Sequence, residues 1–330
     1  MCKVKAPRTT PAPVFSTTSL DLWGPVWCRD NVIQKKTRQH TVRKAWGIIF
    51  VCLHTGAIYL DLCEDYSTAS VLCCIRRFVA TRGQPSIFYS DQGSQLKAAA
   101  KSAKGDEQDI FPDWKEVAAG LPGVSWEFVP VQAHNFNGIS ESFIGKTQRA
   151  LEVTLKPQHL TFGEYLTTLK EIESVLNARP LGELLPDGNP LTVNHLLLGG
   201  RSTVDAPHPP AVTETKLTRR FTYLQDLVDQ WWKKWYRSTF HHLLPSYKWQ
   251  KLVKNLETGD VVLVYKEGLG RGTYRYGRVV ETFPDKEGVV RRAKVELSGQ
   301  SKRTVERAQN DLVLLVKHDY ENPGVGCEQK

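Results

Sequence analysis

Three carboxylates stand out because of where they fall relative to the expected strands and helices. Asp21 lies inside the apolar stretch Leu20–Trp23. Asp91 directly follows a strand expected over residues 87–90, and Glu141 opens an expected helix. In open α/β sheets, sites form beyond the carboxyl ends of the strands, where Asp91 is expected. Three acids that converge there would make an all-oxygen site of the kind that Mg²⁺ or Mn²⁺ prefers, and two such ions about 4 Å apart suit an in-line phosphoryl displacement.

Each of these acids also has a purely structural interpretation. Asp21 suits a turn or a strand edge, and Asp91 suits an Asx-turn with Gly93. Glu141 suits the first turn of a helix, where the helix dipole favours an acid. Spacing alone also leaves open three competing acids, which are Asp61 and Asp65 for the first position and Glu127 for the third.

The apolar pattern predicts an α/β domain with a mixed sheet that would position the acids. The expected strands cover residues 15–23, ended by Gly24 and Pro25, then 46–53 and 57–62 as a hairpin, 86–89, and 124–130. The expected helices run from an N-cap at Ser67 to Gly83, from 141 to 155, and from 161 to 178.

The C-terminal part of the chain has a different pattern. Prolines at 207, 209 and 210 predict a linker, and an amphipathic helix follows, with an apolar stripe of Leu217, Phe221, Leu224, Val228, Trp231 and Trp235. We expect this stripe to mediate self-association, unless it folds back on the chain's own core. Several short strands within about 60 residues, separated by glycine-containing turns, predict a small β-barrel.

Composition and charge narrow the class of protein. The chain is 41% hydrophobic and 24% charged, which is typical of a globular protein. No apolar run is long enough to span a membrane, no secretion signal is apparent, and no C-x-x-C pair occurs among the cysteines, so we expect reduced thiols. Between Glu214 and Lys317 there are 21 basic and 12 acidic residues, which fits either a polyanion partner or a solvated basic surface.

Several sequence blocks resemble the D,D,E integrase core of retroviruses and LTR retrotransposons, and most of all the integrases of Bel/Pao-type elements. The three acidic blocks are Asp21-Leu-Trp-Gly-Pro25, Tyr89-Ser-Asp-Gln-Gly93 and Asn137-Gly-Ile-Ser-Glu141. Further blocks with the same resemblance are Arg76-Arg-Phe-Val-Ala80, Glu173-Ser-Val-Leu-Asn-Ala-Arg-Pro-Leu181, Leu198-Gly-Gly-Arg201, Trp231-Trp-Lys-Lys-Trp235, Gly259-Asp-Val-Val-Leu263 and Gly277-Arg-Val-Val280. The resemblance covers residues 15–315.

This resemblance implies an RNase H-like mixed five-stranded sheet flanked by helices, then a helical linker and a small SH3-like barrel. It implies that Asp21, Asp91 and Glu141 coordinate two Mg²⁺ or Mn²⁺ ions, for 3′-end processing and DNA strand transfer. The implied partner is double-stranded DNA, bound by a homo-oligomer in the nucleus after synthesis in the cytoplasm, with no membrane association. The expected parts are a lead-in (1–14), a catalytic core (15–201), a linker with the amphipathic helix (202–255), a DNA-binding barrel (256–316) and a tail (317–330).

DNA contacts are expected from two groups of residues. The loop before Glu141 and the helix after it supply the first group, which is His134, Asn135, Asn137, Lys146 and Arg149. The expected barrel supplies the second group, which is Arg271, Arg275, Arg278, Arg291, Arg292 and Lys294.

An alternative function is a domesticated or truncated DNA-binding protein that derives from an integrase and no longer catalyses. The chain has no set of the His/His/Cys/Cys type that forms the family's usual N-terminal zinc bundle, and we expect no zinc in it. Lys146 and Arg149 also stand one position later than the lysines of many relatives, a rotation of about 100° around a helix.

Overall fold

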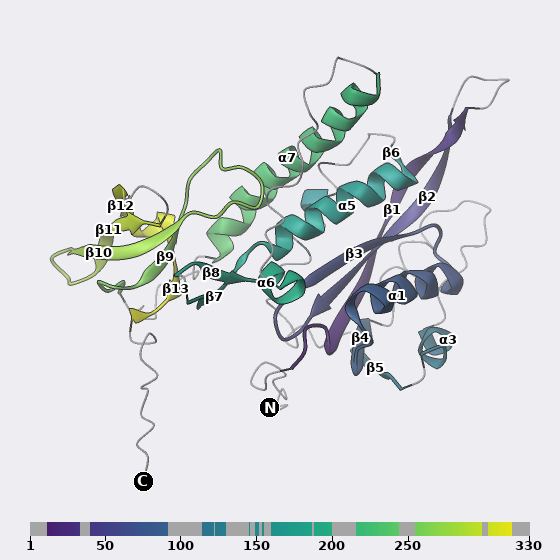
Figure 1. Ribbon diagram of the computed structural model, residues 1–330, viewed down its shortest axis with the longest axis horizontal. Helices are drawn as coiled ribbons and strands as arrows, with labels where there is room; N and C mark the ends of the chain where they lie inside the picture. Colours follow the sequence, from purple (N-terminus) through teal and green to yellow (C-terminus); the bar gives the residue numbers. More distant parts are fainter. Residues whose placement is uncertain are drawn as a thin grey trace, which may run out of the picture. The chain divides into compact units, whose positions relative to one another are not determined.

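The computed structural model describes residues 12–33, 40–91, 114–121, 123–129, 145, 149–151, 154, 160–186, 188–199, 216–243, 255–298 and 303–318 (Figure 1). The chain divides into two compact units. The first consists of Met1–Asn177 with Pro207–Trp231, and the second of Ala178–Ala206 with Trp232–Lys330.

A mixed sheet forms the centre of the first unit, as predicted. Its strands are β1 (Thr17–Ile33), β2 (His40–Cys52), β3 (Ile58–Cys63), β4 (Ile87–Asp91), β5 (Ser125–Val129) and β6 (Leu160–Thr161). The sheet has the order β3-β2-β1-β4-β5, and β6 pairs with the far part of β1. β2 pairs antiparallel with both β1 and β3, whereas β1 pairs in parallel with β4 and β6, and β4 pairs in parallel with β5.

Helices α1 (Thr68–Arg82), α3 (Trp114–Ala119) and α5 (Phe162–Asn177) belong to this unit. The predicted cap of α1 is confirmed, because the Ser67 hydroxyl accepts a hydrogen bond from the Ser70 amide. Both α1 and α5 contact β3. The Phe50 ring of β2 stacks on the Phe78 ring of α1 with centroids 4.4 Å apart, which joins helix and sheet in one core. The expected helix at 141–155 is helical at each position that the structure describes there.

The predicted end of the first strand at Gly24 is wrong. β1 continues to Ile33 and remains paired with β2 beyond a register shift between Trp23 and Val26. The Gly24–Pro25 peptide is cis, and Gly24 has φ +135°, a conformation that L side chains rarely adopt. A bulge accommodates a proline within a strand because the residue there need not donate to the ladder.

An antiparallel sheet forms the centre of the second unit, so the predicted small β domain is present. Its order is β12-β11-β10-β9-β13. The strands are β9 (Val261–Val264), β10 (Tyr276–Pro284), β11 (Val290–Leu297), β12 (Arg303–Ala308) and β13 (Leu312–Val316), with the 3-10 turn η2 (Gln309–Asp311) before the last strand. Alternate residues of these strands, among them Val262, Val279 and Val295, fill its core.

The boundary between the two units differs from the expected catalytic-core limit at residue 201. The hairpin of β7 (Pro180–Leu184) and β8 (Pro190–Thr192) and the short helix α6 (Val193–Leu198) cluster with the second unit. There β7 contacts β13, and the Tyr276 hydroxyl forms a hydrogen bond with Asn189. Contacts between segments about 100 positions apart leave no local signal in the sequence.

Helix α7 (Lys216–Leu243) is the predicted amphipathic helix, with 28 residues. Its apolar side chains from Leu227 to Phe240 are buried within the chain, and Trp231 and Trp235 are at most 1% exposed. In the second unit the Tyr236 ring stacks on Tyr265, and the Trp232 indole donates a hydrogen bond to the Leu269 carbonyl. The expectation that this stripe is an oligomerisation surface is therefore corrected from Leu227 onward. No helix in the described part of the chain has the length and apolar character needed to cross a membrane.

The start of α5 gives a testable prediction about pH. The Glu164 carboxylate accepts two hydrogen bonds from Arg220, at 2.6 and 2.7 Å, and one from the Thr161 amide. The Arg220 hydrogen bonds lower the pKa of Glu164 to about 2. Because the folded-state pKa lies below the unfolded value of 4.5, this stabilisation is full above about pH 4.5 and is lost as the pH falls toward about 2.

When the pH is lowered from neutral to about 3, we expect the melting temperature of Glu164→Gln to fall less than that of the unchanged chain. Melting curves at both pH values test this. The matched control is Glu64→Gln, since that carboxylate is 65% exposed and lies 3.5 Å from its Arg43 partner. An equal acid-dependent drop in Glu164→Gln and in the unchanged chain would contradict the assignment.

Candidate functional site

The register of the parallel strands brings Asp21 and Asp91 to adjacent positions of the first sheet. Leu20 of β1 pairs with Ser90 of β4, and the two aspartates each follow one position later. Neighbouring strands lie about 4.8 Å apart, so the two backbones are close at this level of the sheet. The structure describes only the backbone of Asp91, and Glu141 lies outside the described residues. The meeting of the three carboxylates therefore stays a prediction.

Asp21 borders an apolar floor. Its side chain is half-buried and accepts a hydrogen bond from the Leu22 amide at 2.8 Å. Trp23 lies two residues further along the strand, on the same face, and its ring covers Gly47 of β2, where a Cβ would come within 2.0 Å of the indole. Burial, and then the nearby Asp21 carboxylate, raise the pKa of Tyr66 to about 12. In the sequence, a glycine inside an apolar strand, Gly47, indicates this close approach of the Trp23 ring. No pattern in the sequence indicates that Tyr66 lies near Asp21.

The competing acids have structural partners. Asp61 is 1% exposed and pairs with the Arg77 guanidinium at 2.8 Å. Asp65 accepts hydrogen bonds from Ser67 and Ser70 at the start of α1; burial alone would raise the pKa of Asp65, but these bonds lower it below its ordinary value. Glu127 pairs across the strands with Tyr89 and is exposed. These contacts explain the first two acids without a catalytic role.

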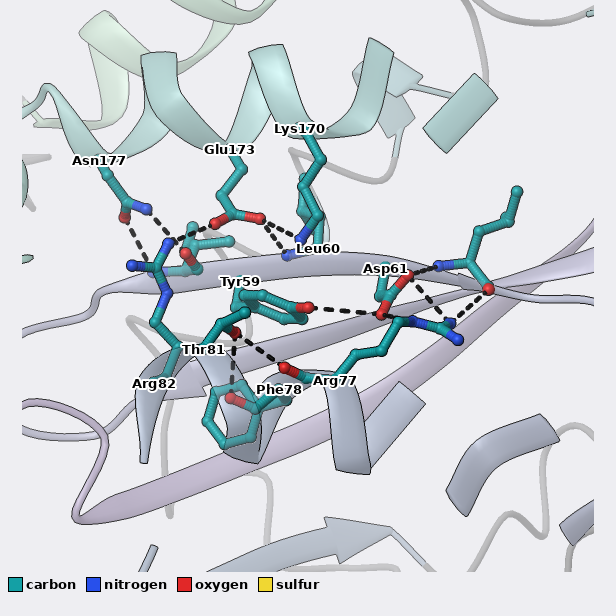
Figure 2. A network of polar contacts seen from close by, with 12 residues as sticks. Tyr59, Leu60, Asp61, Arg77, Phe78, Thr81, Arg82, Lys170, Glu173 and Asn177 are labelled. Carbon is teal, nitrogen blue, oxygen red and sulfur yellow. Dashed lines mark hydrogen bonds and ion pairs between the residues drawn. The ribbon is translucent and has the colours of Figure 1, made fainter. Parts of the chain in front are cut away.

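The edge strand β3 is held by side chains from α1 and α5 instead of another strand (Figure 2). Asn177 accepts a hydrogen bond from the Ile58 amide at 2.9 Å and donates one to the Ile58 carbonyl at 2.7 Å. Glu173 accepts from the Leu60 amide at 2.9 Å. In this way the side chains of α5 replace the backbone of a missing strand.

The same edge is completed by ion pairs. Glu173 is 5% exposed and also pairs with Arg82 at 2.8 Å and Lys170 at 2.9 Å. Further along β3, the Leu62 carbonyl accepts a hydrogen bond from Arg77, the partner of Asp61. This network of hydrogen bonds and ion pairs was not predicted from the sequence. The pattern that could have indicated it is the presence of two polar residues, Glu173 and Asn177, four positions apart among the apolar positions of an expected helix.

A ladder of opposite charges covers one face of the second sheet. We call the outward side chains of β10, β11 and β12 the charge ladder; it consists of Arg278, Glu281, Arg292, Lys294, Glu296 and Glu306. Arg292 pairs with Glu306 at 2.6 Å and Lys294 with Glu281 at 3.8 Å. Arg278 donates to the Gly259 carbonyl at 3.0 Å. Three basic and three acidic residues leave this face without the excess of positive charge expected from the sequence.

The other predicted DNA-contacting residues divide between the described and the undescribed part of the chain. Arg291 pairs with Asp285 in the turn before β11, at 2.6 Å. Arg271 and Arg275 are half-buried between β9 and β10, and Arg149 is exposed. The residues outside the described part are His134, Asn135, Asn137 and Lys146.

Of the residues expected to hold the metal ions, some lie among the described side chains and some do not. Among the side chains that the structure describes, no three His, Cys, Asp or Glu residues are grouped so as to hold a metal ion. The side chain of Asp91 and the whole of Glu141 are not part of that set. Of the three expected ligands, Asp21 is the one whose carboxylate is described.

Three comparisons with known proteins bear on the chain. A family of unknown function, DUF5641, matches residues 219–315, which comprise most of α7 and the second sheet. A chain of the simian T-cell lymphotropic virus intasome, solved in complex with the PP2A regulatory subunit B56 gamma, aligns over 96% of this chain and 85% of its own length, with 11% identity and a TM-score of 0.35. No curated protein sequence matches.

Proposed function

We propose that the chain is an integrase of the retrotransposon type, most similar to those of Bel/Pao elements, which trims the 3′ ends of DNA and transfers them to a target strand. The observation that carries the proposal is the placement of Asp21 and Asp91 one position beyond the Leu20–Ser90 pair of two adjacent parallel strands. The mixed order β3-β2-β1-β4-β5 supports an RNase H-like core. The order β12-β11-β10-β9-β13, with a 3-10 turn before β13, supports an SH3-like second unit.

In this proposal Asp21, Asp91 and Glu141 hold two divalent ions. Carboxylate oxygens fit Mg²⁺ or Mn²⁺, and the carboxylate of the half-buried Asp21, which accepts a hydrogen bond from the Leu22 amide, offers two oxygens with several lone pairs. When bound, the ions supply the positive charge that activates the attacking oxygen and stabilises the leaving oxygen. The apolar floor of Trp23 limits water on one side of Asp21, which strengthens the electrostatic interactions of its carboxylate.

Double-stranded DNA is the proposed partner, and the nucleus is the proposed place of action. Joining two element ends to one target requires more than one active site, so we also propose self-association. Since the apolar side chains of α7 from Leu227 to Phe240 are buried within the chain, we propose that the assembly surface lies elsewhere.

The experiment is a strand-transfer assay with the full chain, a labelled DNA duplex, and Mg²⁺ or Mn²⁺. We expect both nicked and joined products. Asp21→Asn should reduce them by about 10³-fold, since loss of a ligand charge that steadies the ions removes about 4 kcal/mol of transition-state stabilisation. The asparagine still accepts the Leu22 hydrogen bond, so the fold should persist.

The matched control is Glu127→Gln, which removes one exposed carboxylate from the same sheet. It should retain activity within a few fold. Nicked products without joined ones would indicate a nuclease. DNA binding without products, equal in the unchanged chain and in Asp21→Asn, would instead support the non-catalytic DNA-binding protein.

A further inference from the structure

The second half of α7 carries a compact group of basic side chains on its exposed face. Lys233, Lys234 and Arg237 are all exposed, whereas Trp232, Trp235 and Tyr236 of the same turns are buried. The exposed residues lie one, three or four positions apart, so they share one side of the helix. We call Lys233, Lys234 and Arg237 the helix cations.

The helix cations differ from the cations of the charge ladder in that no acid of the described residues forms an ion pair with them. Among the described residues, no ion pair includes Lys233, Lys234 or Arg237, although Asp229 stands one turn before Lys233. In the charge ladder, by contrast, acids lie 2.6 Å from Arg292 and 3.8 Å from Lys294. A phosphate approaching the ladder must therefore compete with a carboxylate that is already in place, and a phosphate approaching the helix cations need not.

Helix stability does not account for these charges. Like charges three or four positions apart, as in Lys234–Arg237 and Lys233–Arg237, destabilise a helix by about 0.2–0.5 kcal/mol for each pair. Basic residues near a C-terminus gain from the helix dipole, but this effect is confined to the last turn, and α7 continues to Leu243. The favourable spacing of Asp229 and Lys233 offsets one of these two pairs, and the other remains a cost that an anionic partner would offset.

We propose that the helix cations form the main phosphate-binding surface of the second unit, and that DNA lies against this face of α7 more than against the charge ladder. The inference rests on the proposed DNA-binding function and specifies its surface. It also assigns a role to part of the region matched by a family of unknown function. Contacts of this kind act on the phosphate backbone and do not distinguish base sequence.

The test measures the salt dependence of duplex binding by the full chain. The helix variant carries Lys233→Gln, Lys234→Gln and Arg237→Gln, and glutamine preserves helix propensity. The ladder variant carries Arg292→Gln and Lys294→Gln from the charge ladder, together with Arg291→Gln, the neighbouring cation of β11, so that it removes the same total charge. Each phosphate contact contributes about −0.9 to the slope of log K against log salt. The magnitude of this slope should therefore decrease by about 2.7 in the helix variant and by less than about 1 in the ladder variant.

A charge-preserving variant, Lys233→Arg with Lys234→Arg, separates charge from structure and should keep the original slope. An equal loss in the helix and ladder variants, or a larger loss in the ladder variant, would overturn the helix surface while leaving DNA binding intact. No binding by the unchanged chain even at low salt would overturn the proposed function itself, and this inference with it.

Discussion

Glu173→Ala is expected to lower the free energy of unfolding of the first unit by about 3 kcal/mol. The carboxylate is 5% exposed and binds the Leu60 amide, Arg82 and Lys170. Removing it leaves a buried amide without an acceptor and a largely buried Arg82 without a counter-charge. Urea denaturation, together with amide hydrogen exchange in peptides from β3 and α5, measures the loss.

Two further variants on α5 make this prediction specific. Glu173→Gln retains an acceptor for the Leu60 amide but loses the charge, so its loss should be intermediate. Thr167→Ala changes an exposed position of the same helix and should stay within about 0.5 kcal/mol of the unchanged chain. Equal stabilities of Glu173→Ala and Thr167→Ala would show that the ion pairs at this edge contribute nothing.

Asp260→Ala is expected to destabilise the second unit by about 3–5 kcal/mol. Asp260 is fully buried and accepts hydrogen bonds from the Glu257 amide, the Lys317 ammonium and the His318 amide. It thereby joins the turn before β9 to the segment after β13. Burial alone would lower the pKa of Lys317, but its bond to Asp260 and the charge of that carboxylate raise it.

The matched control for Asp260 is Glu257→Ala, because Glu257 approaches the same Lys317, at 3.4 Å, but is 51% exposed. An exposed ion pair is worth less than about 1 kcal/mol, so the control should unfold nearly as the unchanged chain does. Hydrogen exchange in peptides from β9 and β10 measures the stability of the second unit separately. This is needed because a chain of two units need not unfold in one transition. Comparable exchange in the two variants would mean that the buried carboxylate does not hold these segments together.

The local elements of the fold could be predicted from the sequence, because periodicity and caps are short-range signals. The helix after Ser67, the helix ending at Asn177 and the short strands after Gly259 all have this origin. The Gly24–Pro25 prediction failed because a bulge lets β1 pass through a dipeptide that usually ends a strand. The assignment of β7 and β8 depends on long-range contacts with β13, which periodicity does not encode.

The candidate site was predictable in part, for the same reason. The acids were found because an aspartate in an apolar strand is unusual, and the register then placed Asp21 next to Asp91 along the backbone. The net charge of the C-terminal third, by contrast, gives all of its basic residues the same weight. It could not separate Arg292 and Lys294, which face acids across strands, from Lys233 and Lys234, which do not.

The side chains that hold β3 also restrict how copies of this chain can assemble. An uncovered edge strand is a template on which another chain can polymerise, and natural proteins guard against it. Here Asn177 and Glu173 occupy the outward amides of Ile58 and Leu60, and Asp61 occupies that of Leu62. A foreign strand would find no free donor among these three amides. A strand that extends the sheet across β3 would first have to displace these side chains, so oligomerisation and aggregation by that route are disfavoured.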